Sequence, residues 1–382
     1  MNEPEKQKRT STPRSRRRRT GFRLVLLGLG GLFGLIVAEL GLALVAPQDL
    51  LSPRYQFSPE YGARPFPNVT MVHSKRGSYH FRYSTNRDGF RGPDEPISNR
   101  YETENIVILG DSRSFGMGAD DGQQYPYLLQ QHLGGKVNIV NLGCPSWGLT
   151  QQIRCFYEKG QLYQPATVIL QTNGNDVEDN QINQVTTIQD GRFRFYDSSN
   201  SANWFKQYLS RSWIQKSNLY NLVRDDLYQL LTRRTVRLPE SAGQTTFMSD
   251  AAQQFYNELL TAFAQDLNDS GIKLIVFSHG MDFRSSPAVQ KNLDELDEAG
   301  LVRYCLLDPW LEGKRDYGSP EGHLLGKLGH EIAAAGLAEL LRLEARPVEH
   351  AVLSADSPQR RGRFGTAQAP RTVHPAPSGA FQ

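Results

Sequence analysis

Unbroken apolar runs of strand length, separated by helical segments, constrain the fold of this chain more than any other feature. Such runs recur after residue 104 without the polar alternation of a half-exposed strand. Strands that are apolar on both faces are typical of a parallel sheet covered by helices on each side. The runs are "NIVILG" (105–110), "VNIVNLG" (137–143), "TVILQ" (167–171), "IKLIVFS" (272–278) and "VRYCLLD" (302–308). The sequence therefore predicts a doubly wound α/β domain with a five-stranded parallel sheet.

Helices are expected between and after these strands, where apolar residues recur at helical spacing. The segments with this spacing are 125–133, 150–162, 249–268 and 329–343. Residues 181–250 interrupt the alternation, and "WFKQYLSRSWIQKSNLYNLVRDDLYQLL" within them also has apolar positions at helical spacing. We therefore expect an inserted helical cap within a domain that spans residues 105–344.

Two further segments flank this domain. Residues 47–104 are rich in Pro, Tyr, Arg and Asn, and aromatic residues sit among turn-forming residues there. This composition predicts an ordered, loop-rich lead-in. Residues 345–382 are mostly Pro, Arg, Ser, Ala and Gly with little to bury, which predicts a disordered tail.

The N-terminus combines a basic tail, residues 1–21, with one long apolar run, "FRLVLLGLGGLFGLIVAELGLALVA" (22–46). At 1.5 Å per residue this run can cross a hydrocarbon core of about 30 Å. A basic flank before a single apolar span predicts a transmembrane helix with a cytoplasmic N-terminus and an extracytoplasmic body, periplasmic or on the outer face. The alternative is a cleaved signal peptide, against which the length of the run and Pro47 argue.

Glu39 interrupts the apolar run two thirds of the way along it. A carboxylate inside a membrane span is costly unless it finds a partner. The sequence leaves two interpretations open. Glu39 pairs with another segment, or the helix tilts so that the side chain reaches the interface.

The distribution of charge excludes one class of protein. Residues 1–19 contain eight Lys or Arg and two Glu, whereas the whole chain has a net charge of only +3. The body therefore carries a small negative net charge, which argues against a nucleic-acid-binding surface on it.

No cofactor or metal is expected from the sequence. Cys144, Cys155 and Cys305 lack metal-ligand spacing, and the chain shows neither a His/Cys/Asp cluster nor a phosphate-binding glycine loop. In an extracytoplasmic compartment one disulfide bond is possible, but the spacing does not identify the pair.

A "GDS" block follows the first strand and places Ser112 two residues past its end. Ligand sites of doubly wound sheets lie at the carboxyl ends of the strands. Ser112 is therefore either a nucleophile at this edge or a serine that caps the following helix. Ser114 lies farther from the strand and is the weaker nucleophile candidate.

Other strand ends carry compatible groups. Gly143, in "NLGCPSWG", lets the backbone N–H approach a ligand closely. Asn175, in "QTNGNDVEDN", can aim its amide at the same edge, and His279 is a candidate pocket residue after the fourth strand. "SPEGHLLGKLGHE" contains His323 as a base, with His330 expected on the helix and outside the chemistry. A nucleophile, donors and a base from separate strand ends are what acyl transfer requires.

These blocks resemble those of the SGNH hydrolases, also called GDSL esterases and lipases, over roughly residues 105–343. The resemblance implies a flavodoxin-like SGNH hydrolase fold with Ser112 as nucleophile and His323 as base. It also implies an oxyanion hole built from the N–H groups of Ser112 and Gly143 and the side-chain amide of Asn175. "DGFRGP", shortly before the first strand, is similar to bacterial membrane-anchored members.

Two positions depart from the pattern of that family. The third block opens with Asn173 where the family has glycine. The residue three before His323, an aspartate in the family, is a proline here. Glu321 is then the first candidate for the carboxylate that orients His323. Asp316 and Asp308 are the alternatives, and a Ser-His dyad stays open.

The sequence and the resemblance together predict a single-pass membrane protein with an extracytoplasmic serine esterase domain. Its expected substrates are O-acyl esters, with acetyl groups on an envelope or exported polysaccharide as the leading candidates. An O-acyltransferase acting on a polysaccharide, a lipase, and a non-catalytic protein that binds a glycan or an assembly partner remain alternatives. The oligomeric state does not follow from the sequence.

Overall fold

A computed structural model describes most of the chain and most of the predicted α/β domain. The described residues are 13–48, 55–75, 79–93, 104–134, 137–198, 216–223, 248–278, 283–313 and 326–344. The predicted tail, residues 345–382, lies outside them.

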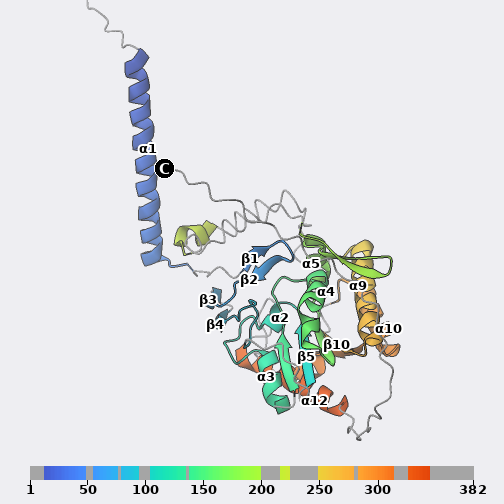
Figure 1. Ribbon diagram of the computed structural model, residues 1–382. Coiled ribbons are helices and arrows are strands. Elements are labelled where there is room, and N and C mark those ends of the chain that lie inside the picture. Colours follow the sequence, from blue (N-terminus) through green and yellow to red (C-terminus); the bar gives the residue numbers. More distant parts are fainter. Residues whose placement is uncertain are drawn as a thin grey trace, which may run out of the picture. The chain divides into compact units, whose positions relative to one another are not determined.

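A five-stranded parallel sheet forms the centre of the domain (Figure 1). Its strands are β5 (Glu104–Leu109), β6 (Val137–Asn141), β7 (Thr167–Gln171), β10 (Lys273–Ser278) and β11 (Arg303–Leu306). All neighbouring strands are parallel, and their order in the sheet is β11-β10-β7-β5-β6. The predicted fold class is thus confirmed, and the order is that of the flavodoxin-like sheet, with its switch point between β5 and β7.

The register brings the ends of β5 and β7 to one level. Leu109, the last residue of β5, pairs with Leu170, one residue before the end of β7. The two loops that follow therefore leave the sheet at the same edge, beside the switch point, where ligands of such sheets bind.

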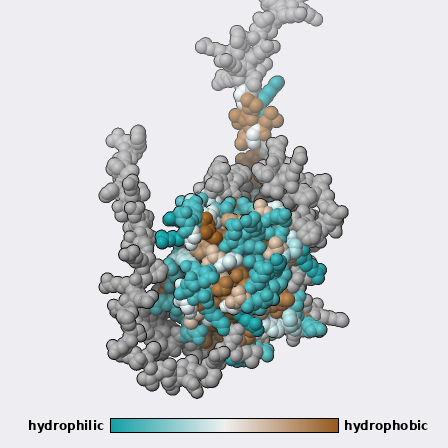
Figure 2. Space-filling view, turned by 90° about the vertical axis from the view of Figure 1, so that its right-hand side faces the viewer, coloured by the Kyte–Doolittle hydropathy of each residue, from teal (hydrophilic) through white to brown (hydrophobic). Residues whose placement is uncertain are grey.

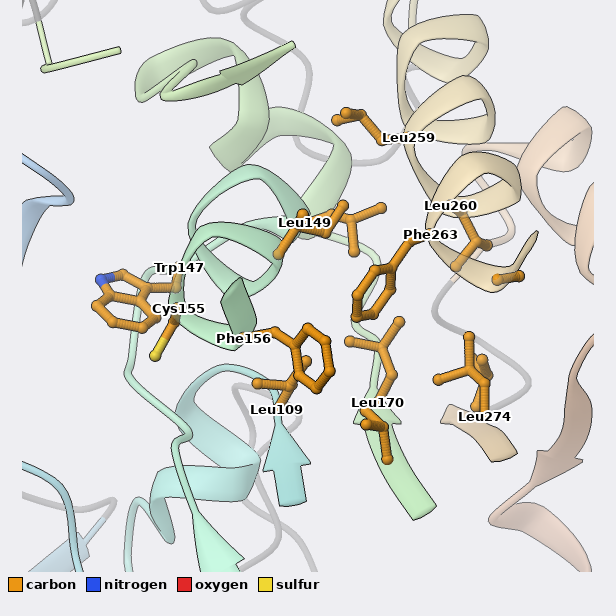
Figure 3. Packing of buried hydrophobic residues seen from close by; sticks show 14 of the residues in the cluster. Leu109, Trp147, Leu149, Cys155, Phe156, Leu170, Leu259, Leu260, Phe263 and Leu274 are labelled. Carbon is orange, nitrogen blue, oxygen red and sulfur yellow. The ribbon is translucent and has the colours of Figure 1, made fainter. Parts of the chain in front are cut away.

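Alternate strand residues feed two separate cores, one on each face of the sheet. On one face Leu109, Leu170 and Leu274 pack against α4 (Leu149–Glu158), α9 (Asp250–Asp269) and α10 (Pro287–Glu298) (Figure 3). Each fully buried side chain of this kind stabilises the fold by about 1.5–3 kcal/mol. The sequence analysis does not predict α10, although Val289, Leu293 and Leu296 lie at helical spacing along it.

The opposite face is covered by α3 (Tyr125–Leu133), α11 (Asp308–Leu311) and α12 (Gly326–Glu344). Ile108 and Ile169, both fully buried, project to this side. Every strand of the five-stranded sheet except the edge strand β11 is buried along its carboxyl half. The unbroken apolar runs are explained by this double coverage.

Two of the three cysteines belong to the first of these cores. Cys144 and Cys155 are fully buried, and burial raises the pKa of both thiols. Cys144, Cys155 and Cys305 form no disulfide bond with one another.

A β-hairpin begins the insertion at 181–250, where the sequence analysis expects helix. It consists of β8 (Thr186–Gln189) and β9 (Arg192–Phe195), paired antiparallel. Asp190 and Gly191 form the turn with φ of +52° and +69°, values that suit Asp-Gly in a two-residue hairpin turn. The expectation of helix is therefore wrong for this hairpin. Of the remainder, residues 216–223 and 248–250 are described, and 218–223 are helical.

The described part of the lead-in contains two further hairpins. β1 (Tyr55–Ser58) pairs with β2 (Gly62–Pro65), and β3 (Thr70–Lys75) pairs with β4 (Tyr79–Ser84). Tyr83 of β4 makes an edge-to-face contact with Phe115 of the main domain. This segment is therefore part of the packed structure.

The N-terminal helix α1 (Pro13–Val45) begins within the predicted basic tail. Its stretch Gly21–Val45 has 25 residues, a mean hydropathy of 2.1 and no buried share, and is long and apolar enough to cross a membrane. Figure 2 shows apolar side chains gathered on this helix, whereas the visible face of the domain is mostly hydrophilic. The predicted span at 22–46 agrees with this stretch.

Candidate active site

The turn after β5, residues 110–116 (the GDS turn), places Ser112 at the carboxyl edge of the sheet. It includes the one-turn helix α2 (Ser112–Phe115). Gly110 has φ of +154°, and a Cβ there would overlap the Ser114 hydroxyl and lie 3.0 Å from Gln171 Cβ. Glycine is needed because β5 turns sharply against β7 at this point.

Asp111, and not Ser112, caps the short helix. Asp111 Oδ1 accepts a hydrogen bond from the Arg113 N–H at 3.1 Å. The hydroxyl of Ser112 is instead directed to Asp111 Oδ2 at 3.2 Å. The helix-capping interpretation of Ser112 is therefore wrong. Because α2 is a single turn, it adds little of the helix dipole that a longer helix would bring to this serine.

Asn173 joins the loop after β7 to the GDS turn. Its Nδ2 donates to Asp111 Oδ2 at 2.9 Å, and its Oδ1 accepts from the Gly174 N–H at 2.9 Å. Ser112 and Asn173 thus share one carboxylate oxygen. The sequence analysis treats Asn173 as a departure from the family glycine. The structure gives its side chain a contact that glycine does not make.

Gly143 packs directly on the GDS turn. A Cβ at this position would lie 2.5 Å from Ser114 Cβ and 2.8 Å from the Phe115 nitrogen, so only glycine fits. The Gly143 N–H donates to Asn141 Oδ1 at 3.0 Å, and Asn141 Nδ2 donates to the Ser114 carbonyl at 2.9 Å. The expected oxyanion donor is adjacent to the turn and is occupied by an internal acceptor in this state.

Asn175 lies in the loop after β7, residues 172–176 (the Asn175 loop), just before α5 (Asp176–Ile182). Its side chain is exposed, and its Nδ2 donates to Asp179 Oδ2 at 2.7 Å. The pKa of Asp179 is raised to about 7. Burial is the largest cause, the Asn175 hydrogen bond acts against it, and the charges of Asp111 and Glu178 act in the same direction as burial. The partner of this amide therefore changes its charge near neutral pH.

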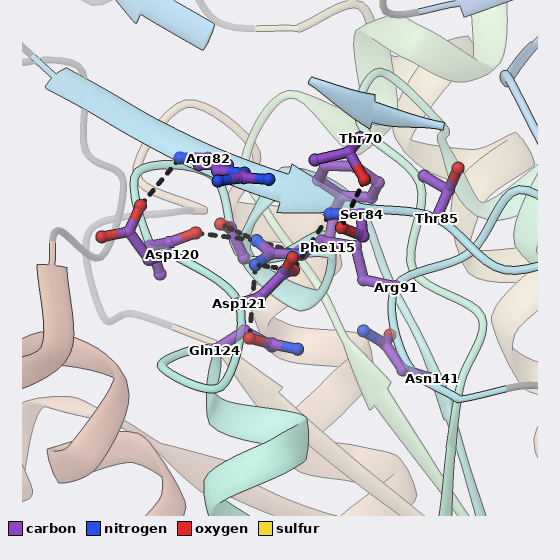
Figure 4. Close-up of polar contacts among 12 residues, drawn as sticks. Thr70, Arg82, Ser84, Thr85, Arg91, Phe115, Asp120, Asp121, Gln124 and Asn141 are labelled. Carbon is purple, nitrogen blue, oxygen red and sulfur yellow. Dashed lines mark hydrogen bonds and ion pairs between the residues drawn. The ribbon is translucent and has the colours of Figure 1, made fainter. Parts of the chain in front are cut away.

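A buried arginine holds the far end of the GDS turn (Figure 4). Arg91, from the "DGFRGP" motif, donates through its guanidinium to the carbonyls of Phe115, Gly116 and Ala119 at 2.7–3.3 Å. It also pairs with Asp121 at 3.1 Å. Burial lowers the pKa of Arg91. Sequence spacing gave no signal for this contact, because three of its partners are backbone carbonyls.

Ser114 and His330 belong to a buried network beneath this edge. Ser114 is fully buried, and its hydroxyl lies 2.6 Å from the Tyr125 hydroxyl and 3.3 Å from Gln171 Oε1. His330 Nδ1 accepts from the Tyr125 N–H at 3.2 Å, and the two rings stack. Their burial and these contacts suit structural roles.

The remaining candidates fall mostly outside the described residues. His279, Asp316, Glu321 and His323 all lie there. Asp308 is described: it is the first residue of α11, after β11, and is partly exposed. The structure thus brings together Ser112, Gly143 and Asn175 at neighbouring strand ends without describing the base.

A cavity of about 240 Å³ opens beside the edge strand β6. Arg87, Asp88, Phe90, Asn141 and Lys159 are among its lining residues, whereas Ser112, Gly143 and Asn175 are not. Its walls come from the lead-in, from β6 and from the residues that follow α4. Asn141, the acceptor of the Gly143 N–H, also lines it. Within the described ranges no group of three His, Cys, Asp or Glu side chains could hold a metal ion.

Comparisons with known proteins give similar solved structures only. No family model matches this sequence, and no curated protein matches it. A GDSL-like lipase from Bacteroides thetaiotaomicron is 12% identical and matches 65% of this chain and 93% of its own, with a TM-score of 0.36. A carbohydrate acetylesterase from Sinorhizobium meliloti is 9% identical, with coverages of 63% and 100% and a TM-score of 0.37. The family 3 carbohydrate esterase of Clostridium thermocellum is 14% identical, with coverages of 64% and 100% and a TM-score of 0.37.

The features that this chain shares with a known fold are its strand order and the location of its motifs at the strand ends. The Gly-Asp-Ser block follows the first strand of the sheet, Gly143 follows the second and the Asn-Gly-Asn-Asp block follows the third. In this arrangement the chain resembles the SGNH hydrolases.

Proposed function

We propose that this protein is a membrane-anchored, extracytoplasmic serine esterase that cleaves O-acyl esters. The observation that supports the proposal is that Ser112, Gly143 and Asn175 lie in the loops that follow the neighbouring strands β5, β6 and β7. Nucleophile and oxyanion donors from separate strand ends suit attack on a carbonyl carbon.

In the proposed mechanism His323 removes the proton from Ser112 as Oγ attacks the ester carbonyl. A carboxylate, Glu321 first and Asp316 or Asp308 as alternatives, orients the imidazole. The N–H groups of Ser112 and Gly143 and the Asn175 amide receive the developing oxyanion. His323 then protonates the leaving alcohol, and water attacks the acyl-enzyme to release the acid.

Two of these donors already have partners in the structure. The Gly143 N–H is bonded to Asn141, and one Asn175 N–H is bonded to Asp179. Asn175 keeps its second amide hydrogen for the oxyanion, since Nδ2 carries two. The Gly143 N–H has only one hydrogen, so we expect substrate to share or displace the Asn141 contact.

The extracytoplasmic location is part of the proposal and follows from the basic residues that precede the apolar stretch of α1. The substrate class, O-acyl groups such as acetyl on an envelope or exported polysaccharide, follows from that location and from the family resemblance. Mass analysis of the mature protein tests the anchor: retention of residues 1–46 supports it, and their loss identifies a signal peptide.

The decisive experiment is labelling of the full-length protein in detergent with a fluorophosphonate, read by intact mass. We expect one adduct on the wild type, none on Ser112→Ala, and one on the matched control Ser114→Ala, whose serine lies in the same turn but is fully buried, whereas Ser112 is 6% exposed. Absence of an adduct on the folded wild type, or an adduct that persists on Ser112→Ala, would contradict the esterase. The first of these results would favour a binding protein.

A second assay separates hydrolysis from acyl transfer. The labelled-acetyl ester of a nitrophenol is supplied with and without an oligosaccharide acceptor. Release of acetate independent of the acceptor supports the esterase, whereas label that moves to the sugar supports an O-acyltransferase.

A further inference from the structure

One short face of α1 is covered by protein, and it lies at the only carboxylate of the apolar stretch. Among residues 21–45 every side chain is exposed except those of Ala38, Glu39 and Leu42, which are partly buried. These three positions share one face because residues three and four apart are neighbours on a helix. Something therefore contacts α1 at this face.

The contact is made by residues 217–219, about 180 positions later in the chain. Glu39 Oε1 accepts from the backbone N–H and the side-chain Nδ2 of Asn218, at 2.6 and 3.1 Å. Glu39 Oε2 accepts from the Ser217 hydroxyl and the Leu219 N–H, at 2.7 and 2.9 Å. Both carboxylate oxygens are thus fully engaged by one short segment.

The segment makes a reciprocal contact with the end of the apolar stretch. Asn218 is only 7% exposed, and its Oδ1 accepts from the Gln48 N–H at 2.9 Å. The Ser217 hydroxyl also accepts from the Tyr220 N–H at 3.1 Å. The N–H groups of Asn218 and Leu219, which have no acceptor within the first helical turn, donate to Glu39 instead. The hydrogen-bonding groups of both partners are completed by the contact.

The position of Glu39 along α1 gives the depth of this contact. Glu39 lies six positions before Val45, which corresponds to about 9 Å along the helix axis. If α1 crosses a hydrocarbon core of about 30 Å, Glu39 lies in its outer part, near the boundary with the headgroups. An unpaired carboxylate would be costly at that depth, and the hydrogen bonds from 217–219 remove much of this cost.

The described segment continues with apolar residues that face away from protein. Leu222 is 48% exposed and Val223 is 45% exposed, and Lys216, also exposed, precedes the turn. Apolar side chains beside a lysine suit the region between acyl chains and phosphates, where interfacial helices bind. The hydrogen bonds to Glu39 attach this segment to the apolar stretch of α1, which points to lipid as the occupant.

We propose that residues 216–223 form a second membrane-contacting element, docked on α1 through Glu39, with Leu222 and Val223 in the outer boundary of the bilayer. The inference rests on the anchor of the proposed function. It gives Glu39 a partner within the chain, one of the two interpretations that the sequence leaves open. It also argues that α1 stays attached, because removal of α1 would leave the 217–219 donors without this acceptor.

The test uses the full-length protein in vesicles of phosphatidylcholine and phosphatidylglycerol. Leu222→Cys is labelled with an environment-sensitive fluorophore in a Cys305→Ala background, where Cys144 and Cys155 are fully buried and do not react. We expect blue-shifted emission and loss of about half of it to nitroxide-bearing lipids. The matched control is Lys291→Cys, whose lysine side chain is 78% exposed on α10, and it should not be quenched.

The same label then tests Glu39. Glu39→Gln and, from the other side, Asn218→Ala should shift the Leu222 label to the emission of the Lys291 control. Arg23→Gln, which removes the other charge of the apolar stretch, should leave it unchanged. Quenching that persists in Glu39→Gln, or an aqueous label in the anchored wild type, would overturn the docking. Release of the wild-type protein by an alkaline wash would instead contradict the anchor.

Discussion

The GDS turn and the Asn175 loop leave neighbouring strands of one sheet, yet the fold holds them in different ways. In the GDS turn Asp111 and Ser112 are 1% and 6% exposed, and the buried Arg91 holds its far end. The Asn175 loop carries its candidate donor on an exposed side chain, whose partner titrates near neutral pH. Packing fixes the first, whereas the Asn175 side chain of the second is held by a single hydrogen bond to Asp179. Substitutions around the first should therefore cost stability, whereas substitutions in the second should change activity.

The largest effect on activity without loss of stability is expected from Asn175→Ala. Removal of an oxyanion donor lowers kcat by about 10²–10³-fold, and an exposed side chain contributes little to folding. The measurement is kcat on a chromogenic acetate ester together with the thermal midpoint. Asn268→Ala, at an exposed position of α9, is the control and should change neither. An unchanged kcat would remove Asn175 from the mechanism.

Arg91→Lys should show the opposite behaviour and cost about 3 kcal/mol of unfolding free energy. A lysine cannot serve the several carbonyls that the guanidinium serves, and buried acceptors left without donors cost about 1–3 kcal/mol each. Denaturant unfolding should give a lower midpoint with the same m-value. The exposed Arg87→Lys is the matched control, expected within about 0.5 kcal/mol of wild type. Equal stability of the two variants would contradict a stabilising role for the contacts between Arg91 and these carbonyls.

Asn173→Gly tests the one contact that joins the two regions. Loss of a hydrogen bond to the Asp111 carboxylate, worth about 1.5 kcal/mol, should lower kcat/KM about tenfold. Asn173→Ala removes the same hydrogen bond without adding the backbone freedom of glycine, so its kcat/KM should fall by the same factor. A loss confined to the glycine variant would assign the effect to the backbone.

The smallest effect is the pH dependence introduced by Asp179. Its pKa is raised from 3.8 to about 7, so between these values the folded state keeps a proton that the unfolded state has lost. Stability therefore falls as pH rises through this window. Asp179→Asn keeps an acceptor for Asn175 and removes the ionisation. Its stabilising effect, measured as a difference in thermal midpoint, should be larger at pH 8 than at pH 5. An effect equal at both pH values would contradict the raised pKa.

The sheet could be predicted because parallel strands that are buried on both faces consist of unbroken runs of apolar residues. The location of Ser112 followed from the end of the first run, and those of Gly143 and Asn175 from the ends of the next two. Asp190-Gly191 is typical of a hairpin turn. The pattern of apolar residues did not predict this hairpin, because strands β8 and β9 have only four residues each.

The roles of other site residues depend on geometry that spacing does not carry. Whether Asp111 or Ser112 caps α2 depends on the backbone at Asp111, with φ of −103° and ψ of −136°. Arg91 donates to carbonyls 24–28 positions later. Every residue has a backbone carbonyl, so residue types do not identify these acceptors. Asn173 became informative only when its reach to Asp111 was known.

The burial of Cys144 and Cys155 has a consequence for the maturation of the protein. Oxidation and thiol exchange proceed through the thiolate, and burial both raises the pKa of these thiols and blocks access to them. Once folded, the core is therefore insensitive to the redox potential of its surroundings. Because its three cysteines form no disulfide bond with one another, the native state does not depend on a disulfide-forming catalyst.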